Sequence, residues 1–357
     1  MTERTRVLLL FGGRSAEHEV SCISAVAAAR ALDPARYEVT PVGITLDGRF
    51  LLSGAAKAAI EAGADVLPRA FVAEGEPVAL EDIANGALGV DVVFPLLHGP
   101  YGEDGTVQGL FELFDLPYVG SGVLGSAVGM DKVMMKVAIE SAGLPVPKWR
   151  AFREWDVSVA ALDDAVRDLG LPVFVKPANM GSSVGITKAH DRAELEAAVQ
   201  LALTFDEWVI VEEAIDAREV EVAVLGDHPV EASAPGEIVP GDEFYSYADK
   251  YLDDNAQLLA PAPLTPEQTD EVRALAIKVF EACRADAMAR VDFLMERTTG
   301  TFYVNEINTI PGFTPISMFP RLWQESGVTY PELLDRLIRL AFERHGRRAK
   351  RAGRPRD

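Results

Sequence analysis

Cysteine is scarce in this chain, and a long apolar run is absent. Only Cys22 and Cys283 are cysteines among the 357 residues. They lie far apart in stretches that favour helices, which argues against a disulfide framework and is typical of a reducing compartment. No stretch approaches the roughly 18 apolar residues of a membrane-spanning helix. We therefore expect a cytoplasmic protein without a membrane partner.

Positive charge is also limited. The 34 lysines and arginines are outnumbered by 55 aspartates and glutamates, which gives a net charge of −21 at pH 7. Nucleic acids and anionic membranes need a basic face, so this balance argues against both as partners. The exception is the segment 346–357, which is basic and has little apolar content. We expect it to be a disordered tail, with a non-specific electrostatic role as the alternative.

Several catalytic motifs are missing as well. The sequence has no GxxxxGK[ST] phosphate loop, and the glycines after its first strand do not form GxGxxG. P-loop and dinucleotide-binding proteins are therefore disfavoured. The sequence also has neither a histidine or cysteine cluster with zinc-ligand spacing nor a GxSxG nucleophile turn. Zinc enzymes and serine hydrolases built on that turn are disfavoured for this reason.

The N-terminal part of the chain alternates apolar runs with glycine-rich turns. Residues 6–11 form a continuous apolar run before a glycine turn and an alanine-rich helix, and the run 91–97 ends in a second glycine-rich loop. This pattern predicts a doubly wound α/β domain, in which ligands bind at the carboxyl ends of the strands. Glu17 and His98 stand at such ends, although a structural role for a lone histidine has about equal weight. Residues 47–89 are less regular and predict an elaborated connection.

Near the C-terminal end, acidic side chains interrupt two runs that otherwise predict buried strands. Arg290 and Asp292 share one strand face, and Glu306 and Asn308 share a face of the next strand. Residues 296–300 between them favour a hairpin turn. Pairing of the two strands would bring the polar side chains together as oxygen ligands for a cation such as Mg²⁺. A sheet with one solvated face is the alternative, with about equal weight.

A loop of glycines and hydroxyls favours a phosphate site. Residues 179–185 follow a strand that ends in Lys176, and such a loop can close over phosphates with its N–H and hydroxyl groups. Glycine–serine turns are common, but a lysine at the end of the preceding strand supports this interpretation. Lys132 follows Asp131, a predicted N-cap, at the start of a helix that extends to about Ala142. Together with the hairpin acids, the two lysines indicate a nucleotide-phosphate site.

Further acids and one irregular segment lie between the hairpin and the loop 179–185, which we call the flap. Glu212 and Glu213 end the predicted strand 208–214, and Glu219 and Glu221 lie in the next strand. They could accept hydrogens from an adenine amino group and ribose hydroxyls, and a solvated strand edge has equal weight. Residues 241–257 show little periodicity, and a long irregular loop inside a domain is usually functional.

Seven motifs in this order resemble the D-alanine–D-alanine ligase family of the ATP-grasp superfamily, over nearly the whole chain. Each motif is weak alone, but seven in register are specific. They are Gly12–Ser21, His98–Gly109, Met130–Lys132, Val175–Gly185, Lys250–Leu252, Arg290–Asp292 and Asn305–Gly312.

The resemblance implies an α/β fold in three parts. A doubly wound N-terminal domain (1–130, pre-ATP-grasp) holds the first substrate. A central subdomain (131–222) carries the flap, and a C-terminal subdomain (223–345) carries the metal site. These two form an α+β ATP-grasp fold, and residues 346–357 are left as the basic tail.

The resemblance also implies the reaction. ATP would convert one D-alanine to D-alanyl phosphate, and a second D-alanine would attack it to give D-alanyl-D-alanine for peptidoglycan precursor synthesis. Two Mg²⁺ ions, with Mn²⁺ as a possible substitute, would be held by Asp292, Glu306 and Asn308, with Glu306 bridging. A homodimer is usual in the family.

For the first substrate, the resemblance implies four side chains. Glu17 would hold the ammonium group of the first D-alanine. Ser182 and Tyr251 would link to Glu17 and hold the flap and the long loop closed. His98 would lie near the same substrate.

For the reacting carbonyl and the second substrate, it implies groups from the hairpin and the following loop. Arg290 and the N–H of Gly312 would stabilise the tetrahedral oxyanion. Ser317 and the backbone of Met318 would take the second carboxylate.

For the nucleotide, it implies three lysines and two acids. Lys132 and Lys176 would meet the α- and β-phosphates, and Lys250 the γ-phosphate. Glu212 and Glu219 would take adenine and ribose. Further positions on the nucleotide side are Ser183, Glu213, Phe244 and Asn305. At Glu213 some relatives have lysine, but only backbone contacts to adenine are expected there.

Two alternatives remain to the expected activity. The first is a ligase of the same fold with D-lactate or D-serine as acceptor, which Tyr251 and the intact loop from Gly312 to Ser317 argue against. The second is a non-enzymatic ATP-binding protein on a degenerate scaffold. The complete set of phosphate lysines and metal ligands argues against that.

Overall fold

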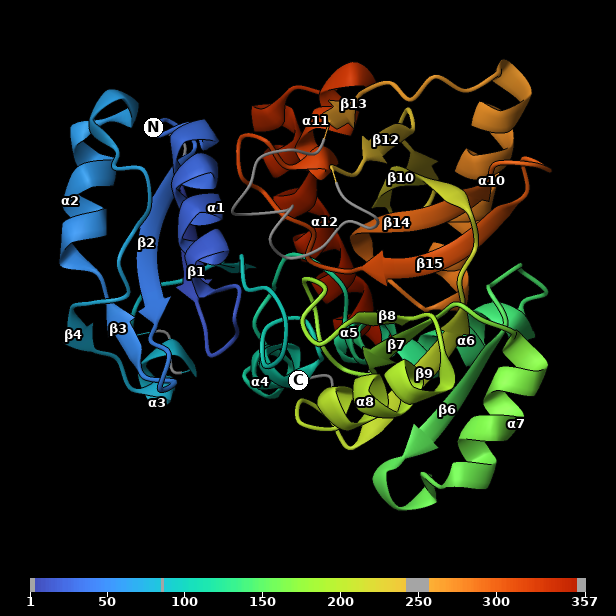
Figure 1. The fold of residues 1–357 in the computed structure, drawn as a ribbon. Coiled ribbons are helices and arrows are strands. Elements are labelled where there is room, and N and C mark those ends of the chain that lie inside the picture. The colour runs from blue at the N-terminus through green and yellow to red at the C-terminus, as the bar shows by residue number, and fades with distance from the viewer. Residues whose placement is uncertain (1–3, 85–86, 242–256, 352–357) are drawn as a thin grey trace.

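The computed structural model describes residues 4–84, 87–241 and 257–351. Three β-sheets organise these residues, each covered by helices (Figure 1). The N-terminal sheet lies at the left of Figure 1, the C-terminal sheet at the upper right and the central sheet at the lower right. Within these ranges, no helix has the length and apolar character needed to cross a bilayer.

The N-terminal sheet has the strand order β4-β3-β2-β1-β5. Its parallel core consists of β1 (Thr5–Gly12), β2 (Tyr37–Ile44) and β5 (Val92–Pro95). The apolar run of β1 is buried on both faces, with its odd-numbered residues in one core cluster and its even-numbered residues in another. Burial on both faces explains why this strand is continuously apolar rather than alternating.

Helices cover this sheet and connect it to the rest of the chain. The alanine-rich helix α1 (His18–Ala31) follows the first glycine turn, as the sequence predicts. The other helical segments of this part are α2 (Gly54–Ala62), η1 (Ala64–Val66), α3 (Leu80–Ala84), α4 (Thr106–Leu113) and α5 (Val123–Met130).

The predicted irregularity of residues 47–89 is only partly correct. Within that range β3 (Phe50–Leu52) and β4 (Glu76–Pro77) extend the sheet as antiparallel edge strands, and α2 packs against β2. Both strands are too short to show a period of two in the sequence. This explains why the segment resembles a loop.

The central sheet has the order β6-β9-β7-β8, with β6 (Trp149–Arg153), β7 (Val173–Pro177), β8 (Thr187–Ala189) and β9 (Trp208–Glu213). A separate apolar core lies between it and two helices, α7 (Val159–Leu169) and α8 (Arg192–Ala202). A short helix, η2 (Glu154–Asp156), follows β6. Ahead of the sheet stands α6 (Lys132–Ser141), where the carboxylate of Asp131 caps the N–H of Met134 at 2.8 Å, as predicted.

The C-terminal sheet has the order β13-β12-β10-β14-β15, with β11 paired to β10. Helix α10 (Pro266–Ala282) covers the apolar face formed by β10, β14 and β15. The strands are β10 (Ala217–Gly226), β11 (Val230–Ala232), β12 (Gly236–Val239), β13 (Gln257–Leu259), β14 (Ala287–Glu296) and β15 (Phe302–Asn308).

The last two helices join the C-terminal sheet to the N-terminal domain. Buried residues of α11 (Met318–Glu325) and α12 (Tyr330–Arg351) belong to the same core cluster as β1 and α1. The N-terminal and C-terminal parts thus share one core, whereas the central sheet has its own. The expected boundary at residue 222 falls inside β10, and we propose to place it before Ala217.

Helix α12 extends into the segment that we expected to be a basic tail. We expected disorder from residue 346, but α12 continues to Arg351. Its last turns are held by acids from other elements: His345 Nε2 lies 3.1 Å from Asp115 Oδ1, and Arg348 pairs with Glu112. Basic side chains near a helix C-terminus also interact favourably with the helix dipole. These tertiary contacts are not visible in the local composition, which explains the error.

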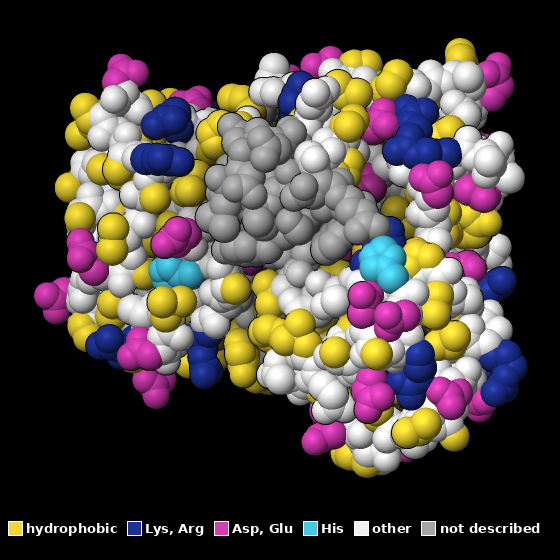
Figure 2. Space-filling view, in the orientation of Figure 1, with side chains coloured by type: hydrophobic (Ala, Val, Ile, Leu, Met, Phe, Trp, Pro, Cys, Tyr) yellow, Lys and Arg dark blue, Asp and Glu magenta, His cyan; other side chains and the backbone are white. Residues whose placement is uncertain are grey.

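Charges are mixed on the molecular surface. On the face shown in Figure 2, acidic and basic side chains are interspersed, and no extended basic patch gathers among the described residues.

Candidate active site

A cleft separates the central sheet from the C-terminal sheet. Its walls come from β7 and β9 on one side and from β10, β14 and β15 on the other, with the 180–186 loop at the edge. The polar lining residues are Lys132, Lys176, Ser182, Ser183, Glu212, Glu213, Glu219, Glu221, Arg290, Asp292, Asn305 and Glu306. Most site residues predicted from the sequence therefore meet in one place.

The hairpin of β14 and β15 forms as predicted. Asp292 lies directly opposite Glu306, and Arg290 lies opposite Asn308. The apolar residues of β14 between these positions face the core under α10. The four polar side chains therefore share the cleft face of the sheet.

A β-bulge adds Asn305 to this face. The register shifts next to the Asp292–Glu306 pair, so that Phe293 is opposite Val304. Val304 and Ile307 are both buried in the core although they are three residues apart. The two residues between them, Asn305 and Glu306, thus both line the cleft. A regular strand would place only one of them there.

Arg290 is held between two acids. Its Nε and Nη2 atoms each donate to Asp292 at 2.7 Å, and Nε lies 3.2 Å from Glu221 Oε2. Burial alone lowers the pKa of Arg290, but Asp292 and Glu221 outweigh it and the pKa is raised. Glu221 and Asp292 are cross-strand neighbours, and Arg290 compensates the repulsion between their charges. From the sequence, Glu221 was considered with Glu219 as a possible nucleotide contact, and its pairing with Arg290 was not predicted.

The predicted metal ligands are adjacent and chemically suitable. Asn308 Nδ2 lies 3.0 Å from Asp292 Oδ2 and 3.5 Å from Glu306 Oε1. A half-turn of the amide about its last bond would present its oxygen beside the two carboxylates instead. Carboxylate and amide oxygens suit a hard cation. Within the described residues no group of three His, Cys, Asp or Glu side chains forms a metal cluster, so the amide is needed to complete a set.

The two predicted phosphate lysines lie at the other side of the cleft. Lys132 Nζ donates to the carbonyl of Met180 at the start of the flap. Lys176 Nζ lies 2.8 Å from Glu212 Oε2 and 3.2 Å from Asn305 Oδ1. Burial lowers the pKa of Lys132, and nearby Glu306 opposes that shift. The bulge at Asn305 thus brings β15 into contact with a lysine of the central sheet.

Glu212 differs from our expectation of an adenine contact, because both of its oxygens face lysines. Lys136 Nζ lies 3.3 Å from Glu212 Oε1, opposite the contact with Lys176. Burial raises the pKa of Glu212, but the two lysines outweigh it and the pKa is lowered. The sequence analysis missed Lys136. Its spacing of four from Lys132 places both on one helix face and was the available signal.

The flap reaches the N-terminal domain through a predicted contact. The hydroxyl of Ser182 donates to Glu17 Oε1. A Cβ atom at Gly181 would lie 2.7 Å from Glu17 Oε2, and one at Gly99 would lie 2.9 Å from it, so both glycines allow the carboxylate to approach. Ser182 has a φ of +50°, a conformation that non-glycine residues rarely adopt and that clusters at functional loops. Ser183, next to it, also lines the cleft.

Three predicted residues, Phe244, Lys250 and Tyr251, lie outside the described residues. The expected link from Tyr251 to Glu17 stays a prediction.

His98 is buried, and both nitrogens of its ring lie close to hydrogen-bonding partners. Its Nδ1 lies 3.0 Å from the carbonyl of Ile310 and must carry the hydrogen, and its Nε2 lies 3.4 Å from Ser24 Oγ. Burial lowers the pKa of His98, so the ring is neutral. The N–H of Phe313 also donates to Ser24 Oγ at 3.3 Å. His98 and Ser24 thus fix the loop after β15 to the N-terminal domain, which is the structural role that we weighed as the alternative.

Glu103 is a buried carboxyl group near Glu17 that was not predicted from the sequence. It accepts hydrogen bonds from the N–H of Gly99 at 3.2 Å and of Ile310 at 3.3 Å. Burial and the neighbouring Glu17 raise its pKa to about 8. Glu103 therefore connects the glycine loop after β5 to the loop after β15 as a largely protonated acid.

The loop after β15 is anchored within itself as well. Ser317 Oγ accepts the N–H of Thr314 at 3.0 Å, and a Cβ atom at Gly312 would lie 2.6 Å from Ser317 Oγ. Met318 begins α11, so its backbone N–H lies at a helix N-terminus. The absence of a side chain at Gly312 allows the loop to fold tightly over this helix start.

The remaining predicted acids lie at the edge of the cleft. Glu213 Oε1 accepts the backbone N–H of Lys148 at 2.8 Å. Glu219 lies on β10 opposite Leu294 of β14, with its side chain at the cleft.

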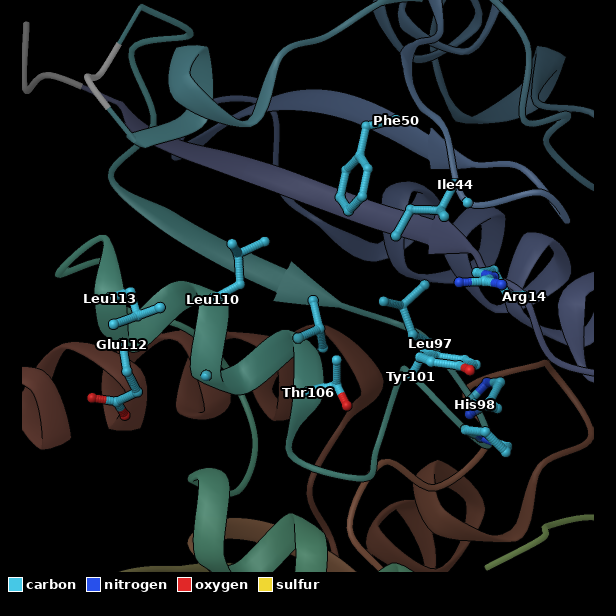
Figure 3. A pocket seen from close by; sticks show the side chains of 16 residues that line it. Arg14, Ile44, Phe50, Leu97, His98, Tyr101, Thr106, Leu110, Glu112 and Leu113 are labelled. Carbon is cyan, nitrogen blue, oxygen red and sulfur yellow. The ribbon is translucent and has the colours of Figure 1, made fainter. Parts of the chain in front are cut away.

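A second cavity of about 680 Å³ lies in the N-terminal domain (Figure 3). Leu110 and Leu113 of α4 face Phe50 and Ile44 across it. Its lining is mainly apolar, and His98 is its only predicted site residue among the described positions. The two predicted phosphate lysines, Lys132 and Lys176, line the cleft instead.

A three-part fold whose cleft is lined by lysines and carboxylates is the arrangement expected of an ATP-dependent ligase. The chain belongs to the D-alanine–D-alanine ligase family. Residues 6–121 match the model described as "D-ala D-ala ligase N-terminus", and residues 138–339 match "D-ala D-ala ligase C-terminus". The family membership, the enzyme class and the α/β fold expected from the seven motifs are confirmed.

Individual relatives support this assignment along the whole chain. A D-alanine–D-alanine ligase of Thermoanaerobacter sp. (strain X514) is 49% identical, covering 98% of this chain and 99% of its own. A D-alanine–D-alanine ligase of Chloroherpeton thalassium is 46% identical, covering 98% of this chain and 99% of its own.

Solved structures of the family are also similar. The D-alanine–D-alanine ligase from Coxiella burnetii has a TM-score of 0.83 and 33% identity, covering 98% of this chain and 97% of its own. The VanG D-Ala:D-Ser ligase from Enterococcus faecalis has a TM-score of 0.82 and 34% identity, covering 95% of this chain and 100% of its own.

Proposed function

We propose that this protein joins two D-alanine molecules to D-alanyl-D-alanine, with conversion of ATP to ADP and phosphate. The observation that carries the proposal is the contact between Ser182 of the flap and Glu17 of the N-terminal domain. It connects a carboxylate suited to an amino-acid ammonium group with the cleft that holds Lys132 and Lys176. An amino acid at Glu17 would therefore have its carboxylate directed toward the bound nucleotide.

In the first step, a carboxylate oxygen of D-alanine attacks the γ-phosphorus of ATP, and ADP leaves. Glu17 accepts hydrogen bonds from the ammonium group of that D-alanine. Lys132 and Lys176 neutralise the α- and β-phosphates, and Ser183 and the flap close over them. The product is D-alanyl phosphate.

In the second step, the amine of another D-alanine, having lost a proton, attacks the carbonyl carbon. Phosphate leaves from the tetrahedral intermediate, and a peptide bond remains. Arg290 uses Nε and Nη2 for Asp292, so the two hydrogens of Nη1 are left for the oxyanion, together with the N–H of Gly312. Ser317 and the N–H of Met318 hold the second carboxylate.

Asp292, Glu306 and Asn308 would hold Mg²⁺, with Mn²⁺ as a substitute. The adjacent carboxylates and amide support this assignment. When bound, the cation supplies neutralisation of the phosphoryl charge. Glu219 and the backbone near Glu213 would contact ribose and adenine.

The cellular setting follows from the product. We infer that the protein acts in the cytoplasm, as a homodimer, in peptidoglycan precursor synthesis and therefore in the maintenance of cell shape. Two buried thiols are consistent with a reducing compartment.

A second candidate is ligation of D-alanine to D-serine. The specific observation that favours it is the structural similarity to a D-Ala:D-Ser ligase, with a TM-score of 0.82. The overall identity to that protein and to the D-alanine–D-alanine ligase of known structure is nearly equal, 34% and 33%. The acceptor must therefore be tested directly.

The test is phosphate release with ATP, Mg²⁺ and D-alanine, with L-alanine as the control. Mass spectrometry of a mixture of D-alanine with D-serine or D-lactate then identifies the product. We expect D-alanine-dependent phosphate release and mainly D-alanyl-D-alanine. Absence of D-alanine-dependent release contradicts the proposal, and a mainly mixed product supports the second candidate.

A further inference from the structure

Lys136 is a fully buried lysine on α6, with 0% of its surface exposed. It lies one helical turn after Lys132, but unlike Lys132 it does not line the cleft. Its ammonium group lies 3.3 Å from Glu212 Oε1. A buried ammonium group is costly unless it is paired, and Glu212 supplies the pairing here. What needs an explanation is why a lysine occupies this buried position at all.

Glu212 is shared between two lysines. Its Oε2 lies 2.8 Å from Lys176 Nζ, and its side chain is only 3% exposed. Lys136, Glu212 and Lys176 thus form a buried triad in which one negative charge stands between two positive charges. Of the two lysines only Lys176 lines the cleft, where it also contacts Asn305.

We propose that Lys136 is a positioning residue for nucleotide binding: it neutralises Glu212, so that the charge of Lys176 acts on the nucleotide phosphates. The inference rests on the proposed function of the cleft as the ATP site. With Lys136 present, the triad carries one net positive charge. Without it, Lys176 and Glu212 form a neutral pair, and the ammonium group of Lys176 is held by the carboxylate.

A purely structural role would not need this arrangement. Apolar residues of similar volume usually replace a buried ion pair with little loss of stability, whereas removing one partner leaves an uncompensated charge. Here the carboxylate left without Lys136 would be balanced by Lys176 alone, which is a lysine of the phosphate site. The effect of Lys136 should therefore appear in the binding of phosphates more than in the binding of the nucleoside.

The first experiment compares ADP and adenosine by isothermal titration calorimetry with the full-length protein. In Lys136→Met we expect ADP to bind about tenfold more weakly, a change of about 1.4 kcal/mol, and adenosine to change less than about twofold. Lys278→Met is the matched control, because it removes one positive charge from an exposed position of α10. It should leave both affinities unchanged.

The second experiment is a rescue. Glu212→Gln removes the negative charge that Lys136 balances, so the double variant Lys136→Met/Glu212→Gln again leaves one net positive charge at Lys176. We expect its ADP affinity to return to within about threefold of the wild type. A merely structural defect would not be corrected by a second substitution in the same core.

Three results would overturn the inference. They are a parallel loss of ADP and adenosine affinity in Lys136→Met, a double variant that binds ADP no better than Lys136→Met, and wild-type ADP affinity in Lys136→Gln. The last variant keeps hydrogen-bonding groups without the charge and serves if the methionine variant does not fold. None of these measurements uses D-alanine, so they are independent of whether D-alanine is the substrate.

Discussion

Ser182 and Glu17, which are 165 positions apart in the sequence, are joined by a hydrogen bond from the serine hydroxyl to the carboxylate. The contact bridges the central and N-terminal parts, which have separate apolar cores. Among the described residues these two parts share no apolar core cluster, and the Ser182–Glu17 hydrogen bond is one of the polar contacts that join them. If Glu17 holds the first substrate as proposed, the position of the flap and the recognition of that substrate depend on the same carboxylate.

The first prediction concerns this link. Ser182→Ala removes a hydrogen bond to a charged group, which is worth about 1.5–3 kcal/mol. We expect kcat/KM for D-alanine to fall by roughly tenfold to a hundredfold, because both the flap and Glu17 lose their orientation. Steady-state phosphate release measures this change. Ser141→Ala, at an exposed position of α6, is the control. Wild-type kinetics in Ser182→Ala would show that the contact is not used in catalysis.

The second prediction concerns Glu306. Glu306→Gln keeps the shape of the side chain but removes one of two carboxylates from the predicted metal set. We expect turnover to fall by at least about a hundredfold, because the affinity for Mg²⁺ drops. Tm should remain near the wild-type value, since Glu306 lies on the cleft face rather than in the core. Phosphate release at increasing Mg²⁺ concentrations, with exposed Glu281→Gln as the control, tests this. Near-normal rates would refute the metal assignment.

The third prediction uses the bulge in β15. Without Asn305, the sequence Val304-Glu306-Ile307-Asn308 alternates between core and cleft with a regular period of two. Deletion of Asn305 should thus preserve the core and the hairpin acids while removing the contact with Lys176. We expect Tm to stay within about 5 °C of the wild type.

The same deletion should raise the KM for ATP several-fold. Calorimetric melting and ATP titration of the deletion variant measure the two effects. Asn305→Ala keeps the bulge but also lacks the contact, so it separates the two causes. Unfolding of the deletion variant alone would show that the bulge itself is required for the fold.

Sequence reasoning predicted the hairpin, its shared face and the phosphate lysines, because each depends on local periodicity and on residue type. It could not place Asn305 on that face from spacing, since a period of two assigns it to the core side. It also missed Lys136, because a lysine on a helix is usually exposed and only the position of Glu212 on β9 explains its burial. The long-range contacts of α12 could not be inferred from the composition of residues 346–351 either.

The fourth prediction concerns pH. The pKa of Glu103 is raised by burial to about 8 in the folded protein, against an ordinary value near 4.5 when the carboxyl is exposed. Between these values the folded state binds more protons than the unfolded state, so this group stabilises the protein at low pH. That stability is lost as the pH rises through about 8.

Glu103→Gln cannot ionise, and we expect its Tm to change less between pH 6 and pH 8.5 than the Tm of the wild type. Its Tm at pH 6 should be lower, because an amide has one acceptor oxygen for the two N–H groups of Gly99 and Ile310. Scanning calorimetry at both pH values is the measurement. Equal slopes for the two proteins would mean that Glu103 does not titrate in this range.

The fifth prediction concerns the junction between α12 and the N-terminal domain. Arg344 is buried, donates to the carbonyl groups of Gly120 and Tyr118, and stacks over the Tyr118 ring at 4.1 Å. Arg344→Met would leave two buried carbonyl groups without these donors, at a cost of about 2–3 kcal/mol. We expect Tm to fall by roughly 5 °C or more.

Arg339→Met on the exposed side of the same helix is the control for the arginine substitution. Within the described part of the chain, Arg339 makes an ion pair with Glu343 at 3.6 Å, between two well-exposed side chains. Such pairs contribute about 0.3–0.5 kcal/mol. Thermal melting should thus separate the two variants by several degrees. Equal melting temperatures would show that Arg344 does not hold the last turns of α12 against the N-terminal domain.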